Sequence, residues 1–173
     1  MIYSGKMNKE TKFIIGAALV TLGLIVGLTF FISAKGAKER TLVTTEVKGI
    51  EAATTHYDLG DVPIKGGVVT REYEIKNTTG NDLELIKIVT SCMCTKASVK
   101  AQSGETKFFA MEMGGDRNPF ISLKIKKDET AKVTVRFDPA AHGPQGVGSF
   151  DRVISLYFDT GLKELTFKGV VVK

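Results

Sequence analysis

Alternation of apolar and polar side chains is the feature that most narrows the folds open to this chain. In 132–137, the apolar residues Val133, Val135 and Phe137 are each separated by one polar residue. The same two-residue period recurs at 69–76, 121–126, 154–159 and 164–168. Successive side chains of a strand point to opposite faces, so this period indicates strands with one buried and one solvated face.

Turn-forming residues separate these segments. The stretches 65–67, 77–82, 127–129 and 159–161 hold glycine, asparagine and aspartate, which tolerate turn geometry. The region shows no helical period, and it has room for about seven or eight short strands with turns about every 10–12 residues. We therefore predict an all-β fold, an immunoglobulin-like Greek-key β-sandwich, over residues 55–173.

A long uncharged segment precedes this region. Residues 13–32 carry no charged side chain, and as a helix they would span about 30 Å, the thickness of a hydrocarbon core. A cleaved signal peptide is the alternative, but its apolar core is shorter, about 7–15 residues, and 33–36 make a poor cleavage site. We predict a tail over 1–12, a transmembrane helix acting as a signal anchor over 13–33, and a linker over 34–54.

The charge of the chain is concentrated around this segment. Of the net charge of +5, residues 1–40 contribute +4, because they hold six Lys and Arg against two acids. The remainder is almost neutral, which excludes the basic footprint of a nucleic-acid-binding protein. Basic residues that flank an apolar segment fit anionic lipid head groups, so we expect the membrane as a partner and no nucleic acid.

Three glycines of the uncharged segment would share one face of a helix. Gly16, Gly23 and Gly27 have this spacing, and Gly23 and Gly27 form a GxxxG pair. Small residues at such positions let two helices approach closely, which predicts a homo-oligomer formed through the helix. The alternative is that glycine is simply common in membrane helices.

Cys92 and Cys94 are the only two cysteines. On a regular strand their sulfurs would lie about 6.5–7 Å apart on one face, too far for a disulfide without a bulge or turn. One interpretation is structural: the pair packs as small apolar side chains or closes a tight disulfide. A second is thiol exchange, although that chemistry usually needs Cys-x-x-Cys at the start of a helix.

The third interpretation of the cysteines is a metal site. Two soft thiolates on one face suit Cu(I) or Zn. Met111 and Met113 lie in a predicted loop, and His142 lies in another, flanked by glycine and proline. Thioether ligands would favour Cu(I), so we name Cys92, Cys94, His142, Met111 and Met113 as candidate metal ligands, with copper as the candidate cofactor.

The motifs of common enzymes are absent. The sequence has no Gly-x-Ser-x-Gly, no phosphate-binding P-loop and no His-Glu-x-x-His. The glycine-rich stretch 143–148 is not followed by a helix signal, and His56 has the position of an ordinary surface histidine. We therefore expect no catalytic residues and no enzymatic activity.

Four short motifs carry a resemblance to a known family. They are Tyr-Asp-Leu-Gly at 57–60, the stretch 74–80, Ser-Cys-Met-Cys-Thr at 91–95 and Val-Arg-Phe-Asp-Pro at 135–139. In order and spacing they resemble a bacterial domain-of-unknown-function family with a Ser-Cys-x-Cys-Thr motif. That family is similar to the immunoglobulin-like modules of major sperm protein and of ciliary and centrosomal proteins.

The resemblance covers about residues 55–172 and departs from the family at two places. Met93 stands where the family usually has glycine, and 104–119 is longer than the common form. The family implies an extracytoplasmic domain in the bacterial cell envelope, usually anchored by a lipid or a helix, with no established activity. Three basic residues precede the uncharged segment and three follow it, so our prediction of a single-pass membrane protein with an extracytoplasmic C-terminal domain rests on this resemblance and the short N-terminal tail.

Three functional hypotheses follow. The first is a protein-binding or structural module, with another protein of the cell envelope docking on a sheet edge by β-strand addition or on the end loops. The second is soft-metal binding through the Cys-x-Cys motif. The third is a subunit of a filament or a multisubunit membrane complex, packed through the glycine face.

Overall fold

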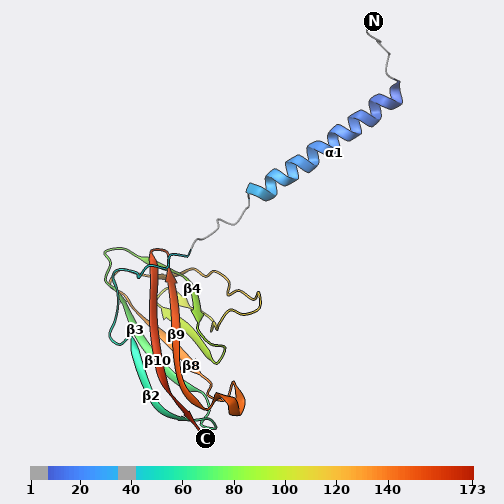
Figure 1. The fold of residues 1–173 in the computed structure, drawn as a ribbon. Helices are drawn as coiled ribbons and strands as arrows, with labels where there is room; N and C mark the ends of the chain where they lie inside the picture. The colour runs from blue at the N-terminus through green and yellow to red at the C-terminus, as the bar shows by residue number, and fades with distance from the viewer. Residues whose placement is uncertain (1–7, 35–41) are drawn as a thin grey trace. The chain divides into compact units, whose positions relative to one another are not determined.

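The computed structural model describes the backbone of residues 8–34, the side chains of 8–26, and all of 42–173. The chain divides into two compact units, Met1–Thr41 and Leu42–Lys173, and each is described by itself. Figure 1 shows the helix of the first unit and the strands of the second.

The first unit contains one helix, α1, at Lys9–Ala34. Its Thr21 hydroxyl bonds back to the carbonyls of Ala17 and Ala18, at 3.1 and 2.9 Å, which satisfies the polar side chain within the helix. A methyl group added at Gly16 or Gly23 would meet no atom of another segment within 4 Å. The surroundings of Gly27 lie outside the described residues, so helix packing stays a prediction.

No helix in the described part of the chain is long and apolar enough to cross a membrane. The predicted transmembrane helix over 13–33 is therefore wrong by this criterion. The predicted single-pass membrane localisation depended on this span and is contradicted with it.

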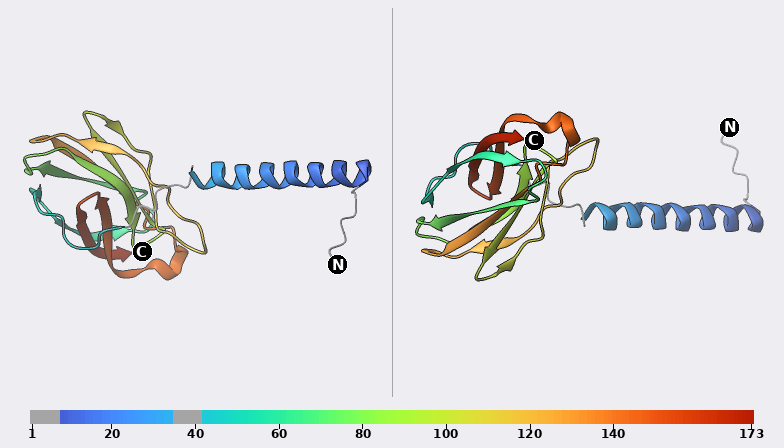
Figure 2. Two further views of the ribbon diagram at one scale, coloured as in Figure 1. Left: turned by 90° about the horizontal axis from the view of Figure 1, so that it is seen from above. Right: turned by 90° about the horizontal axis from the view of Figure 1, so that it is seen from below.

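The second unit consists of two five-stranded sheets. The first sheet has the order β1 (Ile50–Ala52), β3 (Val69–Asn77), β8 (Thr130–Phe137), β5 (Thr95–Ala101) and β6 (Gly104–Glu105). The second has the order β2 (His56–Pro63), β10 (Gly161–Val172), β9 (Gly148–Phe158), β4 (Leu83–Thr90) and β7 (Leu123–Ile125). Only β2 and β10 pair in parallel among these strands. The two sheets are seen as separate layers in Figure 2, and the predicted β-sandwich is confirmed.

The core lies between the sheets and is built from the alternating residues. Val133 and Val135 of β8 are buried, as are Leu156 and Phe158 of β9, while their neighbours along each strand are more exposed. Burying each such side chain contributes about 1.5–3 kcal/mol. The two-residue period seen in the sequence is thus the pattern that separates core from surface.

Residues 42–54, for which the sequence predicts a linker, take part in the sandwich. Val47 and Ile50 are buried in its core, and β1 pairs with the end of β3 through Ile50↔Asn77. Glu46 forms an isolated bridge with Leu162 of β10. The compact unit therefore begins at Leu42, ahead of the predicted boundary at 55. The sequence pattern did not reveal this, because a three-residue strand is too short to show a period.

Two connections that cross between the sheets meet at one end of the sandwich. Residues 91–94 lead from β4 in the second sheet to β5 in the first, and 138–147 lead from β8 back to β9. The second connection contains the short 3-10 helix η1 (Gly143–Gly146). The Asp138 amide donates to the Cys94 carbonyl at 2.9 Å, which ties the two connections together and brings both cysteines beside His142.

Candidate functional site

The cysteines lie in a turn, where the sequence pattern predicts a regular strand. β4 ends at Thr90, and the amide of Thr95 donates to the Cys92 carbonyl at 3.1 Å to close the turn. The buried Thr90 hydroxyl lies 3.0 Å from the Cys92 carbonyl and 2.9 Å from the Thr95 carbonyl. The Thr90 hydroxyl thus contacts carbonyls from both sides of the turn and helps to hold its shape.

The turn brings Cys92 and Cys94 close enough to form a disulfide. Their Cα atoms are 5.3 Å apart, within the usual range for a disulfide. The separation expected for a regular strand is therefore wrong at this place, because the backbone is not extended. The tight disulfide considered under the structural interpretation is the form the structure shows, and both residues are buried, with exposed fractions of 8% and 3%.

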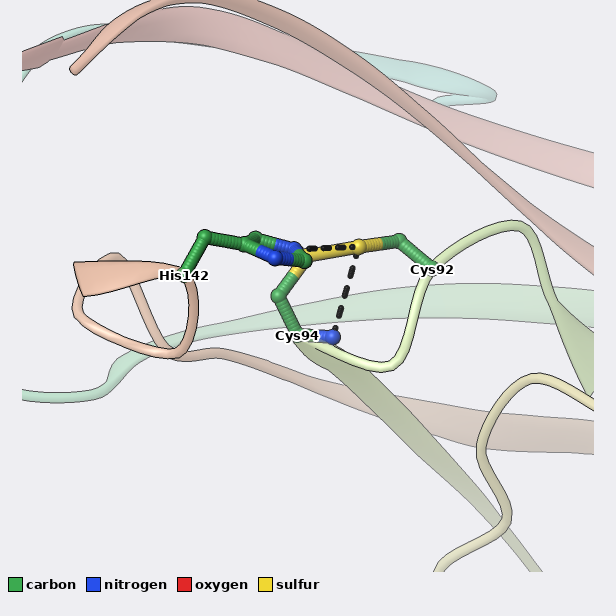
Figure 3. Close-up of side chains that lie close together, drawn as sticks. All are labelled: Cys92, Cys94 and His142. Atoms are coloured by element: carbon green, nitrogen blue, oxygen red, sulfur yellow. Dashed lines mark hydrogen bonds between the residues drawn. A yellow bond between two sulfur atoms is a disulfide. The ribbon is translucent and has the colours of Figure 1, made fainter. Parts of the chain in front are cut away.

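His142 reaches the disulfide from the other connection. Its Nε2 lies 3.2 Å from the Cys92 Sγ, as Figure 3 shows. The loop that carries it is shaped by Asp138, whose carboxylate accepts from the Ala140 amide at 2.9 Å, and by Gly143, whose φ of 61° favours glycine. Ligand atoms of Cys92, Cys94 and His142 all lie within 4.8 Å of one another.

Arg152, which no sequence motif singled out, contacts the second sulfur. From β9, its Nε donates to the Cys94 Sγ at 3.3 Å, and its Nη1 donates to the Asp151 carbonyl at 2.8 Å. A fixed positive charge beside a sulfur stabilises a thiolate once the disulfide is opened. In sequence, Arg152 is one basic residue among many on a strand, and no pattern marks it.

The methionines named as ligands lie in another connection, the one between β6 and β7. Met111 and Met113 belong to the connection between β6 and β7, where the intervening Glu112 pairs with Lys87 in the middle of β4. Met113 is half-exposed and bridges to Asp116. The cysteine turn follows the end of β4, so this connection sets the methionines beside the body of the strand.

His56 has a local role at the start of β2. Its Nδ1 lies 2.9 Å from the Thr166 hydroxyl of β10, and the side chain is exposed. The contact joins the two strands that pair in parallel. This agrees with the interpretation of His56 as an ordinary surface residue.

Two hollows lie beside the groups that surround the disulfide. One, of about 340 Å³, is lined by His142 and Arg152 together with Ser149 and Gln145. The other, of about 300 Å³, is lined by Cys94 and Met93 together with Arg136. Small ligands therefore have access to the groups around the sulfurs even though the cysteines themselves are buried.

The carboxylate with the most elaborate surroundings is Glu112, and its role is structural. Burial opposes its ionisation, but hydrogen bonds from Lys87, the Asn118 amide and Arg117 outweigh this and hold the pKa of Glu112 below its ordinary value. The Lys87 Nζ lies 2.7 Å from Glu112 Oε1, and the exposed fractions of the two side chains are 8% and 13%. The pair therefore fixes the β6–β7 connection onto β4.

Two exposed ion pairs also shift pKa values without forming a reactive site. A hydrogen bond from the Gly60 amide lowers the pKa of Asp58, and the positive charge of Lys168 lowers it further. A hydrogen bond that Lys132 donates to Glu72 raises the pKa of Lys132. In both cases the partner stabilises the charged form at neutral pH, so neither group is poised to exchange a proton there.

Comparison with known families places the cysteine turn inside a recognised domain. The family described as Protein of unknown function (DUF1573) matches residues 50–113. The resemblance predicted from the Ser-Cys-x-Cys-Thr motif is thereby confirmed for the segment that contains Cys92 and Cys94.

Solved structures with similar folds are distant in sequence. A protein of unknown function from Porphyromonas gingivalis W83 superposes with a TM-score of 0.51 at 20% identity, covering 78% of this chain and 51% of that one. This chain thus spans about half the length of that protein. At this identity the likeness shows the fold alone.

Two further structures superpose less well, with TM-scores below 0.5. The PapD-like domain 7 of human CEP192 has a TM-score of 0.42 at 16% identity, covering 79% of this chain and 97% of that one. The periplasmic chaperone SfaE has a TM-score of 0.35 at 10% identity, covering 72% and 58%. No curated protein matches the sequence.

Proposed function

We propose that this chain acts by binding rather than by catalysis, and that its specific ligand is a soft metal ion, Cu(I). The proposed ligands are the sulfurs of Cys92 and Cys94 and the Nε2 of His142. The observation that carries the proposal is the convergence of these donor atoms within 4.8 Å. Two separate connections of the sandwich supply them, so the fold itself assembles the set.

The proposal applies to the reduced form of the pair. The disulfide argues against metal binding by the oxidised form, because thiolates and not disulfide sulfurs are the metal ligands. A dithiol reductant would pass two electrons and two protons to the Cys92–Cys94 bond and would itself become a disulfide. Cu(I) would then displace the two thiol protons as it binds.

The composition of the group favours Cu(I) over Zn²⁺. Thiolates are soft ligands that suit Cu(I). Structural Zn²⁺ sites are almost always four-coordinate, whereas the group found among the described residues holds three potential ligands, namely Cys92, Cys94 and His142. Met111 and Met113 are left out of the proposed set because their connection lies along β4.

The surroundings of the titratable groups support a role without catalysis. A general acid or base needs a pKa near the working pH. The carboxyl groups with shifted values, Asp58 and Glu112, are both shifted downward by hydrogen bonds and charge partners. Their partners hold them ionised, which suits a scaffold and not proton transfer.

Competition for Cu(I) tests this proposal. The full chain is reduced with a dithiol, freed of reductant without air, and titrated against a coloured Cu(I) chelator, alongside an oxidised sample. We expect one Cu(I) per reduced chain, no tight binding by the oxidised chain, and none by the C92S/C94S variant. His142→Ala should weaken binding by about tenfold or more. Because the chain has two histidines, His56→Ala is the matched control and should bind as the unaltered chain does.

Two results would overturn the metal proposal. One is binding that is equal in the oxidised and reduced chains, because the thiolates would then not be the ligands. The other is binding that falls equally in the His56→Ala and His142→Ala variants, because the loop geometry would then be irrelevant.

A second candidate function is docking of a protein partner on the open edge of β3. β1 covers β3 only at Ile75–Asn77, so 69–74 has no strand on that side within the described residues. The Glu72 carbonyl accepts from the Tyr57 hydroxyl at 2.9 Å, so the backbone of Glu72 faces away from β8. An extended segment of a partner would pair with the backbone of this edge by displacing the Tyr57 and Arg71 side chains, which donate to the Glu72 and Thr70 carbonyls.

Proline substitution at the edge tests the docking proposal. Glu72→Pro removes one donor from the open side and leaves the pairing with β8 in place. A photo-reactive side chain at position 71 should cross-link to a partner in the native cell extract, and Glu72→Pro should abolish that product. Undiminished cross-linking by a folded Glu72→Pro chain would show that the edge is not the docking surface.

A further inference from the structure

Arg152 is a charged side chain that contacts the Cys94 sulfur and cannot itself ligate a metal. Its Nε lies 3.3 Å from Cys94 Sγ. A guanidinium has five N–H donors and no acceptor, and it stays protonated in proteins. Arg152 therefore adds a fixed positive charge to the cysteine pair and cannot be a ligand.

The position of this charge is fixed by the surrounding strand. The Arg152 Nη1 donates to the Asp151 carbonyl at 2.8 Å, and the guanidinium lies 5.7 Å from the centre of the Phe150 ring. The side chain is half-buried. Its electrostatic effect on Cys94 is therefore stronger than that of a charge in open solvent.

Charge balance gives this arrangement a consequence for the choice of metal. Two thiolates carry −2, and Cu(I) brings them to −1, which the charge of Arg152 cancels. Zn²⁺ with the same thiolates is already neutral, and Arg152 would bring the sum over these groups to +1. A partly buried site disfavours such an excess.

We propose that Arg152 is a specificity-determining residue that makes the reduced Cys92–Cys94–His142 site select a monovalent soft ion over a divalent one. This inference rests on the proposed metal-binding function. It goes further by assigning the selectivity to a residue outside the ligand set. It also gives a reason for a basic side chain to contact a sulfur at the end of the sandwich.

The test compares the affinities of the reduced chain for Cu(I) and Zn²⁺, each measured with a competing chelator. Arg152→Gln keeps a donor but removes the charge, and Arg152→Lys keeps the charge. The matched control is Arg136→Gln, because Arg136 lines the neighbouring hollow with Cys94 but stacks on Phe108, 4.1 Å from the ring centre. Thermal melting of each variant checks the fold.

We expect Arg152→Gln to weaken Cu(I) binding by about tenfold or more while Zn²⁺ binding is unchanged or tighter, in line with the effect of groups that hydrogen-bond to metal ligands. Arg152→Lys should restore most of the Cu(I) preference, and Arg136→Gln should leave it unchanged. The inference is overturned if both metals lose affinity alike, which is the signature of a structural role, or if neither does. Should the unaltered reduced chain bind no Cu(I), the proposed function itself fails, and the two failures are thereby distinguished.

Discussion

Opening the Cys92–Cys94 disulfide should cost the sandwich little stability. The bond closes a loop that holds only Cys92, Met93 and Cys94. The chain-entropy relation gives about 5.4 cal/mol/K for such a loop, or about 1.6 kcal/mol at 25 °C. The freed thiols would stay buried at the end of the core, where cysteine packs as a small apolar side chain. Both sheets are paired independently of the bond.

Thermal unfolding followed by circular dichroism measures this cost. For the unit Leu42–Lys173, a loss of about 1.6 kcal/mol lowers the Tm by about 5–8 °C. The C92S/C94S variant should melt near the reduced chain and should not respond to reductant. A loss of more than about 4 kcal/mol, well beyond the loop-entropy value, or unfolding on reduction, would refute the reasoning, because the reduced form could not then hold a preformed ligand set.

Three further predictions concern the scaffold. Glu112→Gln alone should destabilise the chain by about 3–5 kcal/mol in urea unfolding, because it leaves the buried Lys87 ammonium without its charge partner. Replacing both Lys87 and Glu112 with apolar residues should cost much less, because no buried charge then remains unpaired. The partners of Glu112 hold its pKa in the folded chain below the ordinary value of 4.5. The stability that the ionised carboxylate contributes is therefore complete above pH 4.5 and is lost as the pH falls through the pKa of the folded chain. Glu112→Gln should flatten the dependence of stability on pH below 4.5. The fully buried Asn77 amide donates to the Ile125 carbonyl at 3.1 Å, so Asn77→Ala should cost about 1–3 kcal/mol by leaving buried groups unsatisfied, which urea unfolding would again measure.

The strands were predictable because burial on one face imposes a period of two. Val133, Val135 and Phe137 show this period in the sequence and are all buried in β8. A one-residue slip in register would expose all three, so the pattern determines register as well as strand identity. The same logic failed for 42–54, where a strand of three residues is too short to display a period.

Of the five residues named from the sequence as candidate ligands, the structure brings three together, Cys92, Cys94 and His142, through a geometry that the sequence did not show. The cysteines and His142 stand out by residue type, but the turn at 91–94 depends on the Thr90 hydroxyl and on a crossing between sheets. Arg152 reaches the site only because β9 lies beside the cysteine turn, a long-range relation that no local pattern encodes. For the uncharged segment, residue type alone gave a membrane span that the described helix does not support.

X-ray absorption at the copper edge would decide whether the cysteines and His142 hold the ion together. The sample is the full chain, reduced, loaded with one equivalent of Cu(I) and kept from air. We predict a three-coordinate ion with two sulfur neighbours and one nitrogen neighbour, and loss of the nitrogen in His142→Ala. A coordination shell without sulfur, or one that His142→Ala leaves unchanged, would contradict the proposed site.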